Sequence, residues 1–266
     1  MDPFLLALAA KMMVTVVIVV LASVLVEKTG PFIGAMIATL PISAGPSYVF
    51  LAWDHGPDFI ASSALMTLHV NAATGLFAAT YALLAQRLNL AGSLSAALFA
   101  WAGAVFVFAR IERDLFSGIL VNVVVYTTAI LLTRAMRRSP PVRSPRRRWW
   151  EVPARAAGVM TLVAVVVLAG NALGPTAAGI AAPFPIVMSS LVVILHSSIG
   201  GRAASSTLAH TLPGMVGFGI AVLVLQTSVL AVGNAVALSA ALAICLAWNG
   251  ALVAISARRA RRAAAA

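Results

Sequence analysis

Residues 12–26 read MMVTVVIVVLASVLV, and residues 159–170 read VMTLVAVVVLAG. Neither stretch carries a charge, and several such stretches extend to the ~18–20 apolar residues that cross a bilayer as a helix. Of 266 residues, 62% are hydrophobic and 9% are charged, and the mean hydropathy is +1.02. This composition excludes an ordinary soluble enzyme and a disordered chain, and the lack of short alternating strands excludes an outer-membrane barrel. The sequence therefore predicts an all-α, polytopic membrane protein.

Gly, Pro and charged residues divide the chain into nine predicted membrane helices. One longer interruption, residues 137–150, reads RRSPPVRSPRRRWW, and its prolines and mutually repelling arginines predict an extended linker. The single cysteine, Cys245, lies in an apolar span and is interpreted as a small core residue. The first residues, MDPF, lack the basic region of a signal peptide, so we expect none to be removed. The nine predicted helices are 5–26, 31–53, 58–85, 90–109, 114–136, 154–172, 175–197, 203–229 and 233–256.

The net charge of +11 reflects membrane topology rather than nucleic-acid binding, because the basic residues cluster at 134–148 and 258–262, directly after apolar spans. Such patches can also attract anionic lipid head groups. Placing residues 137–150 in the cytoplasm puts 15 of the 18 Lys and Arg residues inside, leaving Lys11, Arg110 and Arg113 outside. The chain is therefore predicted to lie in a bacterial inner membrane with its N-terminus outside and its C-terminus inside.

An internal duplication appears when the chain is shifted by 144 residues, which aligns 11–109 with 155–253 without a gap. Gly, Pro, Ser and Thr carry the match, as where Gly30-Pro31 meets Gly174-Pro175 and Thr67-Leu68 meets Thr211-Leu212. One extra span, 114–136, separates the copies, so the second copy starts on the opposite face. We expect two inverted four-helix repeats, 1–110 and 151–266, joined by the helix and basic linker of 111–150.

The segment 28–56, KTGPFIGAMIATLPISAGPSYVFLAWDHG, and its copy in 172–201 resemble GlpM-type small bacterial membrane proteins. That family carries one such four-helix unit, with small residues and a proline midway along the second helix. The resemblance covers both copies and rests on Gly, Pro and apolar residues. It implies that this chain is a tandem duplication of the unit. Some members are linked by name to alginate production, and no mechanism transfers from the family.

Two prolines sit about 15 Å into equivalent spans, Pro41 in the first copy and Pro185 in the second. Proline removes a backbone donor, so each helix should kink or break near the bilayer centre, where exposed amides favour anions. Small and polar residues follow both prolines. The substrate site is therefore predicted to include Pro41, Ser43, Gly45 and Ser47 from the first copy, and Pro183, Pro185, Ser189 and Ser190 from the second.

Histidines and neighbouring polar residues complete the predicted site. His69 and His210 lie deep in their spans, where an ionisable group is a functional candidate, either for proton coupling or as a hydrogen-bond donor to a substrate. An equally good interpretation is a neutral histidine bonded between helices. Asn71 and Thr211 lie beside them. No second ligand lies at helical spacing from either histidine, so no metal and no other cofactor is expected.

Three functional classes remain open, and none of them is an enzyme, because no nucleotide loop, metal motif or catalytic triad motif is present. The first is a secondary transporter or facilitator of a small organic or anionic solute. The second is a non-transporting subunit of an envelope or polysaccharide biosynthesis complex, and the third is a lipid or polyprenyl-phosphate flippase. A small-molecule substrate, anionic lipids and a homo-oligomer or envelope partner are the expected binding partners.

Overall fold

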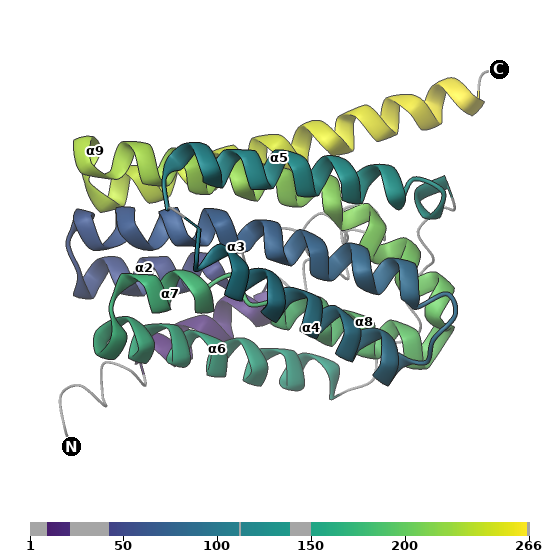
Figure 1. The fold of residues 1–266 in the computed structure, drawn as a ribbon, viewed down its shortest axis with the longest axis horizontal. Helices are drawn as coiled ribbons and strands as arrows, with labels where there is room; N and C mark the ends of the chain where they lie inside the picture. The colour runs from purple at the N-terminus through teal and green to yellow at the C-terminus, as the bar shows by residue number, and fades with distance from the viewer. Residues whose placement is uncertain (1–9, 22–42, 112, 139–149, 265–266) are drawn as a thin grey trace.

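A computed structural model describes residues 10–21, 43–111, 113–138 and 150–264, and helices account for most of them. Six helical stretches in these ranges are long and apolar enough to cross a membrane. They lie side by side along the long axis of the molecule (Figure 1). The prediction of a helical, multi-pass membrane protein is confirmed at this level.

The helices follow the predicted order with shifted ends. After a short helix at Ala10–Leu21, the described elements are α2 (Ala44–Asp54), α3 (Pro57–Leu84), α4 (Leu90–Phe108), α5 (Leu115–Leu132), the 3₁₀ turn η1 (Met136–Arg138), α6 (Glu151–Leu173), α7 (Pro175–Ala181), α8 (Ile186–Ile199) and α9 (Gly201–Ala264). Most of the predicted linker and the segment around Pro41 lie outside the described residues.

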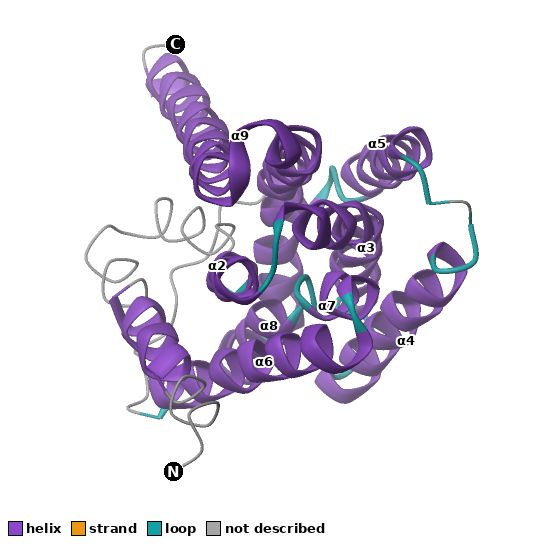
Figure 2. Ribbon diagram, turned by 90° about the vertical axis from the view of Figure 1, so that its left-hand side faces the viewer, coloured by secondary structure: helices purple, strands orange, loops and turns teal. Residues whose placement is uncertain are grey.

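Helix α3 occupies the centre of the bundle, and the other helices enclose it (Figure 2). Most of its membrane-spanning window is buried, whereas α4 and α5 bury only a small part of theirs. Because α3 is enclosed on several sides, its polar residues are shielded from lipid. Five of them, Ser63, Thr67, His69, Asn71 and Thr74, are at most 4% exposed.

One predicted helix end needs correction, and it has a local cause. The fifth helix ends at Leu132 rather than at 136, where the Arg137 guanidinium donates to the Ile130 carbonyl and satisfies the C-terminal turn. The seventh predicted span is interrupted at residues 182–185, as expected near Pro185, and forms α7 and α8. The last two predicted spans are also two helices, which share the label α9 and are divided at Gly233, where the backbone has a φ of 77°.

Gly233 joins the two parts of α9, which pack as an antiparallel pair (Figure 1). The Trp248 indole donates to the Pro213 carbonyl at 2.9 Å, and a Cβ added to Gly217 would overlap the Trp248 ring. The glycine therefore allows the two segments to approach closely, as small residues do between membrane helices.

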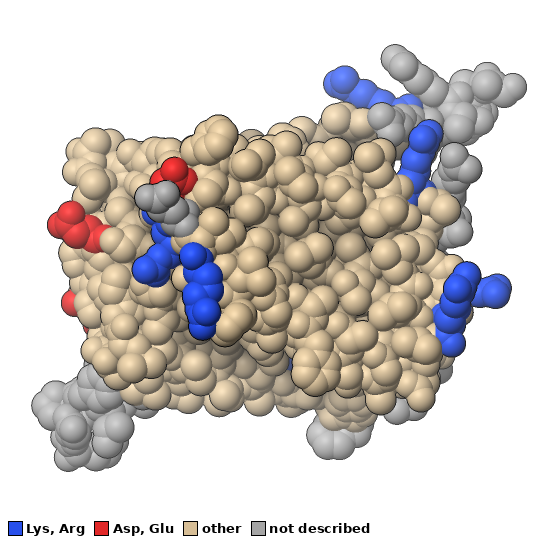
Figure 3. All heavy atoms as spheres, viewed as in Figure 1, with Lys and Arg blue, Asp and Glu red and all other residues tan. Residues whose placement is uncertain are grey.

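Charged residues separate to the two ends of the bundle. Asp54, Asp58 and Asp114 lie at one end, where α2 ends and α3 and α5 begin, and Lys11 forms a salt bridge with Asp54 there. Arg87, Arg134 and Arg202 lie at the opposite end of the helices. On the face shown in Figure 3, acidic side chains are confined to the first end. This separation agrees with the sorting of charges made from the sequence.

Candidate functional site

The buried polar residues of α3 contact two other helices. Ser63, Thr67 and Thr74 contact the segment α7 and the residues that follow it. His69 and Asn71 contact α5. Together these two interfaces form the candidate site.

The interruption expected at Pro185 is present between α7 and α8, and its cause can be followed atom by atom. In an uninterrupted helix the carbonyl of residue 179 would accept from the amide of residue 183, which is a proline and has none. The Thr67 hydroxyl supplies the missing donor, with Oγ1 3.0 Å from the Gly179 oxygen. The carbonyl of Ala181 loses its partner to Pro185 in the same way and accepts from the Phe184 amide instead.

Helix α3 supports the break at three points. The Ser63 hydroxyl donates to the Pro175 carbonyl at 2.8 Å, and the Thr74 hydroxyl donates to the Pro183 carbonyl at 3.1 Å. Thr67 also bonds the Tyr48 hydroxyl at 2.7 Å, which connects α2 to the same point. Irregular backbone inside a membrane is tolerated where protein groups satisfy it, and α3 provides those groups here.

On the α5 side, Asn71, Asn122 and Tyr126 form a closed hydrogen-bond network. The Asn71 amide donates to Asn122 Oδ1 at 2.8 Å, and the Tyr126 hydroxyl donates to Asn71 Oδ1 at 3.1 Å and to the Asn71 carbonyl at 2.9 Å. The Asn122 amide donates to the carbonyls of Leu68 and Gly118. Each side-chain amide oxygen and nitrogen has a protein partner, so this network holds α5 against α3.

His69 lies two residues before Asn71 and is fully buried. Its Nδ1 is 2.9 Å from the Leu65 carbonyl oxygen, and its Nε2 is 3.0 Å from the Ser117 hydroxyl on α5. Ser117 belongs to the capping box of α5, in which its amide donates to the Asp114 carboxylate at 2.6 Å. Hydrogen bonds from the Ser117 side chain and from its amide hold the pKa of the exposed Asp114 carboxyl below its usual value, and the nearby His69 acts in the same direction.

Residues next to the predicted site share hydrophobic neighbours. Phe184, inside the break, packs against a cluster that contains Tyr48 and Leu51, and Ile186 packs against a cluster that contains Phe50. The start of α2 and the break of the second copy therefore share neighbours. Pro183 also contacts α3 directly through Thr74.

Other predicted site residues make only local bonds in the described structure. The Ser47 hydroxyl donates to the Ser43 carbonyl, and the Ser190 hydroxyl donates to Val187. His210 Nδ1 bonds the Ser206 carbonyl of its own helix, and the hydroxyl of the neighbouring Thr211 donates to Leu208. Gly45 lies in the first turn of α2, Pro185 precedes the first residue of α8, and Pro41 lies outside the described residues.

His69 and His210 do not share a level along the bundle. The α3–α9 contacts Ala82–Ser205 and Asn71–Gly219 show that the helices run antiparallel, so His69 lies near residue 219 of α9. His210 is then about 13 Å away along the axis, at 1.5 Å per residue. The described contacts connect His69 to α5 rather than to His210.

Several residues of these interfaces were not part of the predicted site: Tyr48, Ser63, Thr67, Thr74, Ser117, Asn122 and Tyr126. For α5 the sequence does contain a pattern that indicates the interface: Gly118, Asn122 and Tyr126 recur every four residues and so share one helix face. The partner of Thr67 could not be predicted, because only the three-dimensional structure places Gly179 beside it.

Comparison with known proteins adds no assignment: no family model matches the chain, and neither the curated proteins nor the solved structures contain a match.

Proposed function

We propose that this chain is a secondary transporter or facilitator of a small organic or anionic solute, which works by alternating access between two inverted copies of a four-helix unit. Such transporters commonly place the substrate near the bilayer midplane, where helices of the two copies are interrupted. In this proposal the bacterial inner membrane is the location, and the nine-span topology has the basic linker on the cytoplasmic side.

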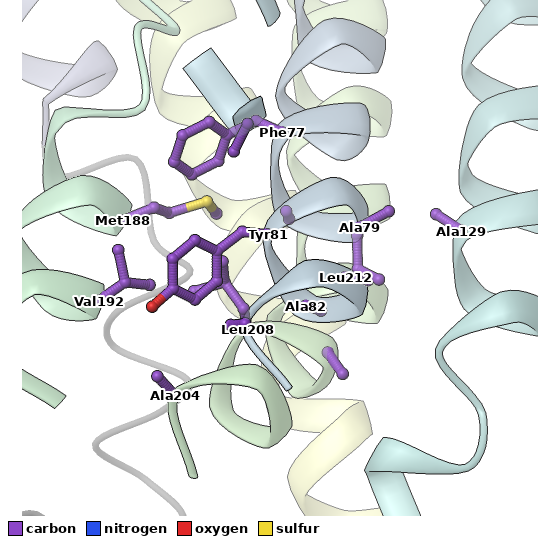
Figure 4. Packing of buried hydrophobic residues seen from close by; sticks show 14 of the residues in the cluster. Phe77, Ala79, Tyr81, Ala82, Ala129, Met188, Val192, Ala204, Leu208 and Leu212 are labelled. Carbon is purple, nitrogen blue, oxygen red and sulfur yellow. The ribbon is translucent and has the colours of Figure 1, made fainter. Parts of the chain in front are cut away.

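The observation that carries the proposal is that the two largest hydrophobic clusters are built from equivalent residues of the two copies. One cluster combines the start of α3 with the end of the first part of α9, and the other combines the end of α3 with the start of α9. Figure 4 shows part of the second cluster, where Tyr81 of α3 packs between residues of α8 and α9. A shift of 144 residues converts members of one cluster into members of the other: Ile60 and Ala204, Ala64 and Leu208, Leu68 and Leu212, Ala78 and Val222, Tyr81 and Leu225, Ala85 and Val229, Tyr48 and Val192, and Leu51 and Leu195.

This exchange supports inversion for a geometric reason. A two-fold axis in the membrane plane swaps residue i with residue i+144 and reverses the helix direction, so each end of α3 should meet the opposite end of its copy. Parallel repeats, related by an axis along the membrane normal, would bring equivalent ends together instead. Helix starts agree with the same shift: Pro57 and Gly201 begin α3 and α9, and Leu90 and the residue after Gly233 begin the fourth helix of each copy.

Inversion matters for transport because two copies of one fold in opposite orientations can exchange conformations. The inward-open and outward-open states are then nearly equal in energy, and a modest solute-binding free energy can shift the population. The α7–α8 break supplies the irregular backbone that such a site needs.

The test is uptake into proteoliposomes, with candidate solutes chosen by a metabolite-toxicity screen of a deletion strain. The doubly substituted Pro183→Ala/Pro185→Ala protein, whose break can close into a regular helix, is expected to lose uptake. Pro213→Ala is the matched control, because Pro213 lies inside α9 without interrupting it. Uptake at the wild-type rate by the doubly substituted protein would rule out the broken helix as the site. If the wild-type chain transports none of the solutes tested, a scaffold or flippase role becomes the better hypothesis.

A further inference from the structure

Helix α5 ends in a positively charged turn that the core of the bundle holds in place. Met136 of η1 packs against one of the two largest hydrophobic clusters, and its carbonyl accepts from the Ser206 hydroxyl of α9 at 3.1 Å. The Arg137 amide donates to the carbonyl of the buried Thr133 at 3.4 Å. The backbone that carries Arg134 and Arg137 is therefore fixed against α9, just outside the membrane-spanning part of α5.

The described protein groups do not balance the charge of this turn. Arg137 Nη2 donates to the Ile130 carbonyl at 2.6 Å, whereas its buried Nε has no hydrogen-bond partner. Neither Arg134 nor Arg137 forms a salt bridge with the residues that the structure describes. Burial and the nearby charge of Arg134 hold the pKa of the Arg137 guanidinium below its usual value. An anion bound beside the two arginines would offset both effects.

The membrane-spanning part of α5 presents an apolar stripe that leads to this turn. Helix α5 lies at the edge of the bundle (Figure 2). Leu120, Val124 and Leu131 are 48–63% exposed, and their spacings of four and seven residues place them on one helix face. Arg134 follows Leu131 by three residues and extends that face. The stripe is about 16 Å long, about half the thickness of the hydrocarbon core, so it matches the acyl chains of one leaflet.

We propose that Arg134 and Arg137 bind the head group of an anionic phospholipid, whose acyl chain lies along Leu120, Val124 and Leu131. A guanidinium donates in a planar fork that matches a phosphate group, and the head group supplies the negative charge that the turn lacks. A free phosphate or an acidic peptide has no acyl chain to cover the stripe. On the face shown in Figure 3, the charged side chains at this end of the bundle are basic. The site does not depend on the transport function proposed above.

The test is native mass spectrometry of the full chain in detergent, titrated with phosphatidylglycerol or with phosphatidylcholine of the same acyl chains. We expect wild type to bind its first phosphatidylglycerol more tightly than phosphatidylcholine. One arginine at a membrane surface contributes about fivefold to the affinity for an anionic lipid. Arg134→Gln/Arg137→Gln should therefore weaken phosphatidylglycerol binding about 25-fold and leave phosphatidylcholine binding unchanged. Arg134→Lys/Arg137→Lys, which keeps both charges, should retain most of the preference.

The matched control is Arg110→Gln/Arg113→Gln, which removes two exposed arginines from the opposite end of the bundle. This control should bind phosphatidylglycerol within about twofold of wild type. Arg134→Gln alone covers the case in which the double variant does not fold, because Arg134 is exposed, and it should lose about fivefold.

Three results would overturn the proposal. One is an equal loss in the control and in the Arg134 and Arg137 variants, because the attraction would then belong to the net charge of the chain. Another is an equal loss for phosphatidylcholine, which would indicate a damaged fold. The third is displacement of bound phosphatidylglycerol by millimolar inorganic phosphate, which would indicate a site for a free anion.

Discussion

The hydroxyl of Thr67 is expected to stabilise the broken helix, and Thr67→Val is the substitution that tests it. Valine keeps the shape of the fully buried side chain but removes the donor to the Gly179 carbonyl and the acceptor for the Tyr48 hydroxyl. Hydrogen bonds between membrane helices contribute about 0.6 kcal/mol on average and up to about 1.7 kcal/mol. Two lost bonds, with an unsatisfied carbonyl left behind, predict a loss of about 1–3 kcal/mol.

Double-mutant cycles separate the two bonds. Tyr48→Phe removes only the bond between Tyr48 and Thr67, so it should cost less than Thr67→Val, and the double variant should cost less than the sum of the two by about 0.5–1 kcal/mol. Pro183→Ala restores an amide that can reach the Gly179 carbonyl. In that background Thr67→Val should lose part of its effect.

The assay is reversible unfolding of the purified chain in mixed micelles with increasing SDS, followed by far-ultraviolet circular dichroism, with Thr67→Ser as the variant that retains the hydroxyl. The reasoning fails if Thr67→Val unfolds within about 0.3 kcal/mol of wild type, which is below any effect that two buried bonds should have. It also fails if the Thr67→Val cost is the same with and without Pro183.

Three further predictions use other parts of the structure. Gly217→Ala should disrupt the pairing within α9, because its Cβ would overlap the Trp248 ring, whereas Gly250→Ala, which meets open space, should be tolerated; the SDS unfolding midpoint compares them. Asp114→Ala should destabilise the chain at neutral pH. The lowered pKa of the Asp114 carboxyl means that this stabilisation is present above the unfolded pKa and is lost as the pH falls through the folded one, so the two proteins should converge in acid during a pH series of unfolding. Reporter fusions after Arg138 and Arg262 should report cytoplasm and fusions within 54–57 the exterior, and a cytoplasmic signal from 54–57 would contradict the nine-span topology.

Parts of this picture were predictable because they depend on local chemistry. Apolar runs of sufficient length form membrane helices whatever their neighbours, so the positions of α3, α4 and α6 agree with the sequence pattern within a few residues. Pro183 and Pro185 together remove two backbone donors within three residues, and the interruption expected at Pro185 is present. The separation of Arg87 and Arg202 from Asp54 and Asp58 likewise follows from which helix ends carry charge.

What the tertiary structure alone decided is the set of partners for each polar group. The sequence shows that Pro183 deprives Gly179 of a donor, but a deep carbonyl can be satisfied by any nearby helix, and only the packing of α3 against α7 selects Thr67. It shows His69 deep in a span, but not that the first turn of α5 lies beside it and supplies Ser117. Hydropathy does not predict these partners, because every candidate helix is apolar. A hydrogen bond requires two atoms within about 3 Å of each other, and that distance is set by how the helices pack.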